Sequence, residues 1–190
     1  MQRILLSVAA LLGLASAGFR TGKCLNPKLQ DNFEIEKYVG VWYEQYRDYD
    51  FAFSDPSGEC TVAEYSFNDD GSVKVHNSQY ITSNKTLDDT VGRATCDGAQ
   101  CQVRFSQYQP FGDYRVVSVD YDEYTIIYSC DALAENFKLE DLWILGRERE
   151  IEPTRLAELK TLALEKLQDY DESQMRRTYQ GDECEYVAQF

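Results

Sequence analysis

The feature that most constrains the fold is a series of short strand-like segments between Val39 and Arg147. These segments are rich in Tyr, Val, Ile, Phe and Thr, and turn signals such as Asn68-Asp69-Asp70-Gly71 interrupt them about every 8 to 14 residues. That spacing is typical of an antiparallel sandwich or barrel. The sequence predicts eight strands, at Val39–Asp48, Cys60–Phe67, Ser72–Thr82, Thr86–Cys96, Cys101–Gln107, Tyr114–Asp120, Tyr124–Cys130 and Leu139–Arg147.

The pattern changes after Glu152, where the period of the apolar residues becomes helical. Pro153 suits the first turn of a helix, because its missing N–H would have no partner there. One amphipathic helix of about four turns is expected, packed on the outside of the sheet. Its apolar stripe comprises Leu156, Leu159, Ala163, Leu167 and Tyr170.

The N-terminus has the three parts of a secretory signal peptide. A basic start at Met1–Arg3 precedes the apolar run Ile4–Leu14 and the small residues Ala15-Ser16-Ala17. The apolar run is too short for the roughly 20 residues that span a bilayer. We therefore expect a signal peptide at residues 1–17, no transmembrane segment, and a secreted domain at residues 18–190.

Composition excludes several classes of function. The chain has 33 acidic and 19 basic residues, for a formal charge of -14, and its Lys and Arg residues form no cluster. This balance argues against a nucleic-acid partner, which requires a basic surface. The single histidine, His76, cannot supply a metal or catalytic site that needs two imidazoles, so no metal is expected.

The six cysteines are an even number, as expected for disulfides in an oxidising compartment. Six cysteines allow 15 pairings, and spacing alone does not choose among them. Cys96 and Cys101 flank the tip of an expected hairpin, where a local disulfide is geometrically plausible. The alternative for these two is a redox-active or intermolecular pair.

Three short motifs resemble the signature of the lipocalin family. Gly40-Val41-Trp42-Tyr43 matches G-x-W on the first strand, and Val119-Asp120-Tyr121 resembles T-D-Y with Val in place of Thr. Arg147 ends the eighth strand, where the lipocalin arginine lies across the motif tryptophan and closes the barrel. The resemblance implies an eight-stranded up-and-down barrel with one C-terminal helix outside, and Gly40, Trp42, Asp120, Tyr121 and Arg147 as its structural residues.

Further matches resemble the branch of apolipoprotein D, the insect bilin-binding proteins (insecticyanin) and crustacyanin. They include Gly22-Lys23-Cys24, Asn32-Phe33, Ala63-Glu64-Tyr65 and Tyr128-Ser129-Cys130. The resemblance to this branch implies that Cys24 pairs with Cys130 and Cys60 with Cys184. The bridge between Cys96 and Cys101 departs from the pattern of the branch.

The lipocalin resemblance also implies which side chains line the barrel. Side chains alternate along a strand, so an inward Trp42 sets the parity of its strand, and family parity sets the others. Ser118 falls on the inward parity and His76 on the outward parity. Ordinary core packing is the alternative for each aromatic residue, and a buried polar network is the alternative for Glu44. The expected ligand contacts are Glu44, Tyr46, Tyr65, Val75, Asn77, Gln79, Phe105, Tyr114, Val116 and Trp143.

The resemblance implies a secreted carrier that binds a small hydrophobic ligand non-covalently, such as a bilin or carotenoid pigment, a fatty acid or a steroid. No cofactor is required. The alternative is a subunit of a pigment-binding homo- or hetero-oligomer, or a lipocalin that captures a mediator. An enzyme like lipocalin-type prostaglandin D synthase needs an activated thiol, and all six cysteines have plausible disulfide partners.

Two surface features complete the expectations from sequence. Asn84-Lys85-Thr86 is an N-glycosylation sequon on an expected turn, which makes Asn84 the candidate glycosylation site. The loop from Asp48 to Gly58 contains Tyr49, Phe51 and Phe53, which suit either a lid over the barrel mouth or a surface for a partner.

Overall fold

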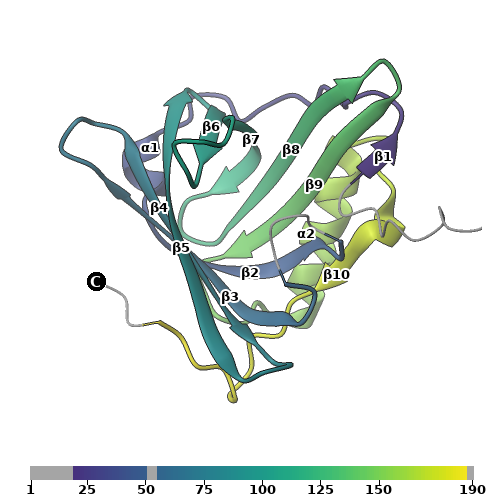
Figure 1. Ribbon diagram of the computed structural model, residues 1–190. Helices are drawn as coiled ribbons and strands as arrows, with labels where there is room; N and C mark the ends of the chain where they lie inside the picture. Colours follow the sequence, from purple (N-terminus) through teal and green to yellow (C-terminus); the bar gives the residue numbers. More distant parts are fainter. Residues whose placement is uncertain (1–18, 51–54, 188–190) are drawn as a thin grey trace, which may run out of the picture.

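The computed structural model describes residues 19–50 and 55–187, which form an antiparallel barrel with a helix on its outer side (Figure 1). The expected signal peptide at residues 1–17 and the residues Phe51 and Phe53 lie outside the described residues. The barrel and the external helix confirm the fold class expected from sequence.

Eight strands form the barrel in up-and-down order, and pairing of β9 with β2 closes it. Two further strands of three residues extend the sheet: β1 (Phe19–Thr21) pairs with β9, and β10 (Met175–Arg177) pairs with β2. The barrel strands are β2 (Gly40–Asp48), β3 (Gly58–Phe67), β4 (Val73–Ile81), β5 (Thr86–Asp97), β6 (Gln100–Arg104), β7 (Gly112–Asp120), β8 (Tyr124–Ala134) and β9 (Phe137–Gly146).

The turn between β3 and β4 follows from its sequence. Gly71 has φ +81°, a conformation that glycine adopts without steric cost, and its N–H donates to the carbonyl of Asn68 at 2.9 Å. The Asp70 carboxylate accepts from the backbone N–H of Ser72 at 3.1 Å. Such local side-chain bonds explain why Asn, Asp and Gly favour turns.

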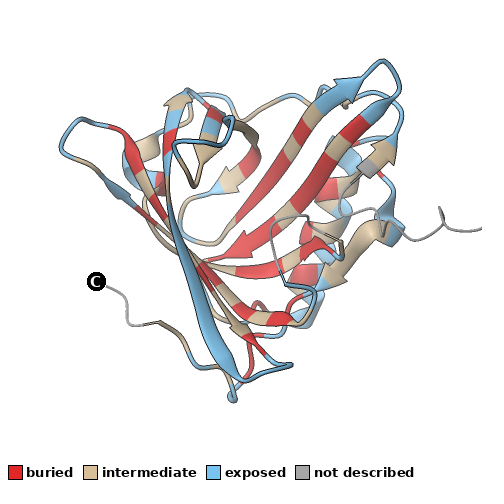
Figure 2. Cartoon of the chain, viewed as in Figure 1, coloured by how far each residue is buried: buried red, intermediate tan, exposed pale blue. Residues whose placement is uncertain are grey.

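Side-chain alternation divides the apolar residues into two clusters. The interior cluster fills one end of the barrel, and the helix cluster lies between the barrel wall and α2. Buried residues run along β8, β9 and β2, whereas β5 is exposed along most of its length (Figure 2). The buried residues of the interior cluster are Tyr38, Trp42, Tyr65, Val73, Val75, Ala94, Ala99, Val116, Ile127 and Leu145.

Helix α2 (Pro153–Lys166) begins as the sequence predicts. The Glu152 carboxylate caps it by accepting from the backbone N–H of Arg155 at 3.0 Å, with Pro153 in the first turn. Leu156, Leu159 and Ala163 are buried against the barrel, and Leu167 and Tyr170 continue the same stripe. Burial of a leucine side chain contributes about 1.5 to 3 kcal/mol, so this stripe fixes the helix on the wall.

Several boundaries differ from those expected. Strand β6 ends at Arg104, so Phe105 follows the strand instead of lying within it, and β8 continues to Ala134. A four-residue helix, α1 (Ile35–Tyr38), precedes β2, and a 3-10 turn, η1 (Glu172–Gln174), precedes β10. Elements this short carry no hydrophobic period that sequence reasoning can detect.

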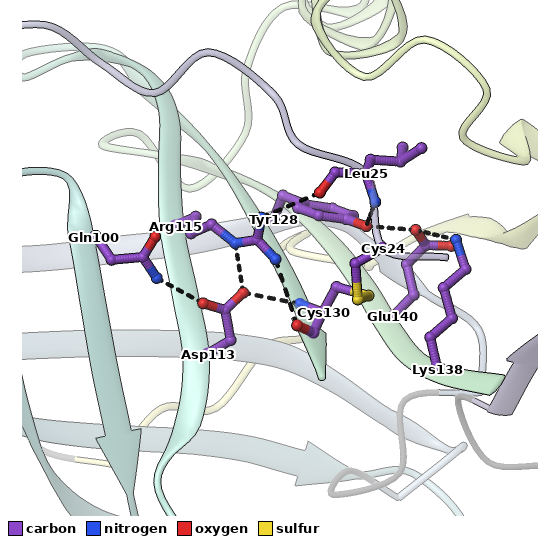
Figure 3. Close-up of a disulfide and its surroundings, with 9 residues drawn as sticks. All are labelled: Cys24, Leu25, Gln100, Asp113, Arg115, Tyr128, Cys130, Lys138 and Glu140. Atoms are coloured by element: carbon purple, nitrogen blue, oxygen red, sulfur yellow. Dashed lines mark hydrogen bonds and ion pairs between the residues drawn. A yellow bond between two sulfur atoms is a disulfide. The ribbon is translucent and has the colours of Figure 1, made fainter. Parts of the chain in front are cut away.

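The N-terminal segment is fastened to the outer wall of the barrel around the Cys24–Cys130 disulfide (Figure 3). Arg115 lies over the ring of Tyr128, with 4.9 Å between its guanidinium carbon and the ring centroid, and donates to the Leu25 carbonyl at 3.2 Å. Tyr128 accepts from the N–H of Leu25 at 2.9 Å and donates to Glu140 at 2.6 Å. These bonds satisfy polar groups that the segment brings against the wall.

A buried acidic pair ties β1 to the same wall. Asp48 accepts a hydrogen bond from the Tyr170 hydroxyl and lies 3.3 Å from the Arg20 guanidinium. Burial raises the pKa of Asp48 to about 7 and that of the neighbouring Asp141 to about 8, and mutual repulsion adds to the effect on Asp141. Arg20 also bonds Asp50 at 2.7 Å and so joins β1 to the end of β2.

All six cysteines form the three expected disulfides. Cys24–Cys130 and Cys60–Cys184 join residues 106 and 124 positions apart, so they fasten both ends of the domain to the barrel. Cys96–Cys101 spans only 5 positions, across the hairpin between β5 and β6.

Removing the long-range and the local disulfides should have unequal costs. In the chain-entropy model a loop of 124 residues corresponds to about 5 kcal/mol and a loop of 5 residues to about 2 kcal/mol. We expect the double variant Cys60→Ser/Cys184→Ser to lose roughly twice the free energy of unfolding that Cys96→Ser/Cys101→Ser loses. Urea denaturation followed by circular dichroism measures both, and a larger loss for the local pair would contradict the prediction.

Candidate ligand-binding site

One end of the barrel is closed by Arg147. Its guanidinium carbon lies 3.7 Å from the centroid of the Trp42 ring, and its nitrogens donate to the carbonyls of Tyr121 at 2.8 Å and Val41 at 2.9 Å. The Trp42 indole N–H donates to the carbonyl of Tyr38 at 2.8 Å, and Trp42 has no exposed surface. A planar guanidinium stacked on an indole excludes water while its N–H groups stay bonded.

The other motif residues lie at this closed end. Gly40 has φ +101°, and a Cβ there would lie 3.2 Å from Arg147 Nη1, so both conformation and space favour glycine. The Tyr121 hydroxyl accepts from the N–H of Glu34 at 2.7 Å, and the Asp120 carboxylate accepts from the N–H of Asp122 at 3.0 Å. The residues expected to have structural roles therefore meet in one place.

Above the stack, four hydroxyl groups form a chain. Thr125 donates to Tyr38 at 3.4 Å, the hydroxyls of Tyr38 and Tyr114 are 2.7 Å apart, and those of Tyr114 and Tyr65 are 3.0 Å apart. The rings of Tyr38 and Tyr65 stack with centroids 5.5 Å apart. Burial raises the pKa of Tyr65 to about 12 and raises those of Tyr38 and Tyr114, so all three hydroxyls keep their protons at neutral pH.

The interior becomes less tightly packed toward the other end, where β2 ends and β9 begins. Val116 and Val75, at the level of the floor, are buried, whereas Tyr114, Phe105 and Trp143 are only partly buried against the interior cluster. Phe105 packs over Gly92 of β5, where a Cβ would lie 2.6 Å from its ring. The structure thus brings six expected contacts together: Tyr65, Val75, Phe105, Tyr114, Val116 and Trp143.

The two expected amides lie on β4, on the face that it shares with Val75. Asn77 Oδ1 is buried and has no hydrogen-bond partner among the described residues. Gln79 donates to Asp88 of β5 at 3.2 Å, and its side chain lies over Gly58 of β3. A buried carbonyl oxygen without a partner is costly, so Asn77 stands out as a group that a ligand could satisfy.

Glu44 is part of a buried polar network. Its carboxylate accepts from the Thr178 hydroxyl at 2.6 Å and lies 3.6 Å from the Arg47 guanidinium. Burial raises the pKa of Glu44, and Arg47 and Thr178 counteract that effect. Arg47 donates to the carbonyls of Asp55 and Gly58 at 3.2 and 2.8 Å, so it also holds the chain that enters β3.

The expectation that Tyr46 lines the barrel is wrong. A β-bulge between Glu44 and Tyr46 shifts the register of β2 against β9, so Tyr46 packs with the helix cluster and lies under Lys160 of α2. Arg47, not Tyr46, pairs with inward Glu44. The bulge places a buried charge in the barrel wall where the alternation predicted an aromatic ring.

The expectation that Ser118 faces the barrel interior is also wrong, because of a second bulge. The register of β7 against β8 shifts between Val116 and Ser118, and the Ser118 hydroxyl lies 3.3 Å from the Tyr124 hydroxyl. Tyr124 packs against the helix cluster on the outer face, so Ser118 faces outward. In both strands one extra residue reverses the alternation on which the parity depends.

Sequence reasoning missed four residues of the interior: Tyr38, Arg47, Thr125 and Thr178. Tyr38 lies in α1, before the first barrel strand, where parity along strands does not apply. Thr125 is fully buried and shares its strand with the outward Tyr124 and Ile126, a parity that could have identified it. Thr178 follows β10, a strand that the sequence pattern does not reveal.

His76 lies on the face of β4 opposite Asn77. Its Nε2 is 2.9 Å from Asp89 of β5, and its Nδ1 is 3.8 Å from Glu64 of β3. The described residues contain no group of three or more His, Cys, Asp or Glu placed to hold a metal ion. Within the same residues, no helix is long and apolar enough to cross a membrane.

Comparison with known proteins identifies the family. The model of the lipocalin / cytosolic fatty-acid binding protein family matches residues 39–182, more than half of the chain. The chain belongs to this family. Rabbit (Oryctolagus cuniculus) apolipoprotein D is 35% identical over 167 residues, which cover 84% of this chain and 86% of the rabbit protein.

Solved structures of other lipocalins share the fold. Insecticyanin from Manduca sexta has a TM-score of 0.72 at 20% identity and covers 86% of this chain and 89% of its own. Lobster apocrustacyanin A1 has a TM-score of 0.71 at 17% identity and covers 88% of this chain and 93% of its own. These two structures confirm the fold, and the 35% identity to apolipoprotein D confirms the lipocalin branch suggested by the sequence motifs.

Replacing Arg147 by lysine should loosen the closed end of this lipocalin. Lysine cannot stack a planar fork on Trp42 while donating to both Tyr121 and Val41. We expect Arg147→Lys to lower the free energy of unfolding by roughly 2 to 4 kcal/mol.

Arg104→Lys is the matched control, since Arg104 lies over the exposed ring of Phe111 at 4.5 Å and should cost less than about 0.5 kcal/mol. Urea denaturation followed by tryptophan fluorescence measures both variants. Equal losses would contradict a special role for the Arg147 stack.

Proposed function

We propose that this lipocalin is a secreted carrier that holds a small hydrophobic ligand non-covalently inside its barrel. The ligand is a pigment such as a bilin or carotenoid, a fatty acid or a steroid, and no further cofactor is required. Burial of apolar surface supplies the affinity, and the few polar groups of the interior fix the orientation. The names of the relatives support a carrier of the apolipoprotein kind.

One observation carries the proposal. The inward side chains are fully buried around Trp42 and Val116, but Tyr114, Phe105 and Trp143, nearer the other end, keep exposed surface within the barrel wall. The aromatic side chains of the interior are therefore buried at the Arg147 end and partly exposed toward the other, the gradient that a ligand cup requires.

The alternative is a subunit of a pigment-binding oligomer. Apolar side chains are exposed at the strand ends and loops around the mouth, a composition that suits a protein interface. Tyr49, at the start of the loop expected to be a lid or a partner surface, is 53% exposed. The other large apolar side chains exposed at this end, within the described residues, are Leu87, Tyr108, Phe111, Leu133 and Phe137.

An enzyme like lipocalin-type prostaglandin D synthase is the less favoured reading. Its mechanism requires an activated thiol inside the barrel. All six cysteines of this chain are in disulfides. A thiol titratable in the native protein would return this reading to consideration.

Ligand binding is tested by absorbance titration with biliverdin, astaxanthin and retinol. We expect saturable, one-to-one binding of at least one of them, and Trp143→Ala should weaken it about tenfold because it removes part of the wall. Tyr46→Ala is the matched control, since Tyr46 packs outside against α2 and its loss should leave the affinity unchanged.

The outcomes of the titration separate the readings. No spectral change with any of the three compounds would contradict a hydrophobic carrier of this kind. Size-exclusion chromatography of the same samples distinguishes a monomeric carrier from the oligomer, which would elute earlier once pigment is bound.

Secretion and glycosylation are proposed together. Cleavage after Ala17 would expose Gly18 as the N-terminus, and the sequon residue Asn84 lies on an exposed turn between β4 and β5. There Thr86 donates its hydroxyl to the Asn84 side chain at 2.6 Å. We expect protein expressed in insect or mammalian cells to reach the medium with Gly18 first and to lose mass on glycosidase treatment. Asn84→Gln is the control for glycosylation. Retention inside the cell would contradict secretion, and a mass unchanged by the glycosidase would contradict glycosylation.

A further inference from the structure

The hydroxyl chain on the barrel floor has one more proton than it uses. Four hydroxyls, those of Thr125, Tyr38, Tyr114 and Tyr65, each carry one proton, and three hydrogen bonds connect them. One proton is therefore left to donate to another group. Buried hydroxyls normally find such a partner, because an unmade hydrogen bond in a dry site is costly.

The direction of the chain indicates where the spare proton lies. Either hydroxyl can be the donor in the Tyr38–Tyr114 pair and in the Tyr114–Tyr65 pair. Because Thr125 donates to Tyr38 and bonds that run head to tail strengthen one another, the favoured order has Tyr38 donating to Tyr114 and Tyr114 donating to Tyr65. In that order the spare proton is on Tyr65, the end of the chain that lies on β3 next to β4. Within residues 19–50 and 55–187 Tyr65 has no hydrogen-bond partner other than Tyr114.

A hydrogen-bond acceptor without a partner in the described part of the chain, Asn77 Oδ1, lies on the neighbouring strand β4 of the same barrel wall. Asn77 of β4 is paired with Ala63 of β3, and Tyr65 is two residues further along β3 on the same face, paired with Val75. Diagonal neighbours of this kind are about 7–8 Å apart at the backbone, within reach of long and aromatic side chains. Among the described residues the buried Asn77 Oδ1 accepts no hydrogen bond, and it belongs to the residue diagonal to Tyr65, whose hydroxyl has a proton to donate.

We infer that the ligand of this barrel carries an alcohol group, which accepts from the Tyr65 hydroxyl and donates to Asn77 Oδ1. The inference rests on the proposed carrier function and specifies its ligand class. The alcohol oxygen has lone pairs for the first bond and a proton for the second, so one group completes both. The apolar part of the ligand then extends toward Phe105 and Trp143.

Related end groups complete only one of the two bonds. An aldehyde or ketone accepts from Tyr65 but has no proton for Asn77. A carboxylate also lacks that proton, and it would bring a negative charge toward the buried Glu44. An unmodified hydrocarbon end completes neither. Selectivity among ligands with the same apolar body follows from these unpaired groups.

Retinol, retinal and retinoic acid test this inference, because they share one apolar body and differ in the end group. We expect the native protein to bind retinol about tenfold more tightly than retinal, equivalent to about 1.4 kcal/mol, and more tightly than retinoic acid. Quenching of tryptophan emission gives all three dissociation constants. The series on the native protein needs no variant that could fail to fold.

Two variants separate the two bonds. Asn77→Leu should bring the affinities for retinol and retinal within about twofold of each other, since only the alcohol donates to Asn77. Tyr65→Phe should weaken both ligands by a similar factor, since both accept from Tyr65. Asn136→Leu, on the exposed hairpin between β8 and β9, is the matched control and should leave the native preference unchanged.

Each result bears on a defined part of the inference. Equal binding of retinol and retinal by the native protein, or a preference that survives Asn77→Leu, would overturn the alcohol assignment while leaving the carrier function in place. Binding of biliverdin or astaxanthin but of none of the three retinoids would overturn the alcohol assignment alone. Folded protein that binds none of these five compounds would overturn the carrier function as well.

Discussion

The stack of Arg147 on Trp42 is the interaction on which the rest of the structure depends. Eight strands closed by β9–β2 pairing form a tube, and this stack with α1 converts one end of the tube into a floor. The guanidinium donates to backbone carbonyls of residues 37–41 and to the carbonyl of Tyr121. It therefore joins the segment that leads into β2 to the turn after β7. The glycine of the motif, Gly40, leaves room for it. A barrel closed in this way can be packed at one end and still hold a ligand at the other.

The polarity of the interior follows from what the floor requires. Tyrosine rings fill the space above Trp42 as well as phenylalanine would, but each brings a hydroxyl that must be hydrogen-bonded. The chain of Thr125, Tyr38, Tyr114 and Tyr65 satisfies all but one of these protons. Glu44 and Arg47 meet the same requirement near the other end by pairing with each other, and Glu44 also accepts from Thr178 of the C-terminal segment. The interior is therefore apolar in surface but contains a few fixed polar groups, as selective ligand sites do.

Sequence patterns predicted most of the fold and part of the site. Alternating strands, the Asn68–Gly71 turn and the apolar stripe of α2 are local signals, and the structure has all of them. The parity expected for Tyr65, Val75 and Trp143 also held, because their strands keep a regular register there. The predicted inward orientation of Tyr46 is wrong because the bulge after Glu44 contains no glycine or proline that would reveal it in the sequence. Tyr38 was missed because the barrel floor is completed by a helix of one turn outside any strand.

The claim that this lipocalin holds its ligand inside the barrel is tested most directly by a crystal structure of the protein with bound retinol. We expect electron density for the ligand between Trp143 and Tyr65, with its oxygen within hydrogen-bond distance of the Tyr65 hydroxyl and the Asn77 side chain. Density on the outer surface, with the interior side chains closed over an empty or water-filled barrel, would contradict the claim.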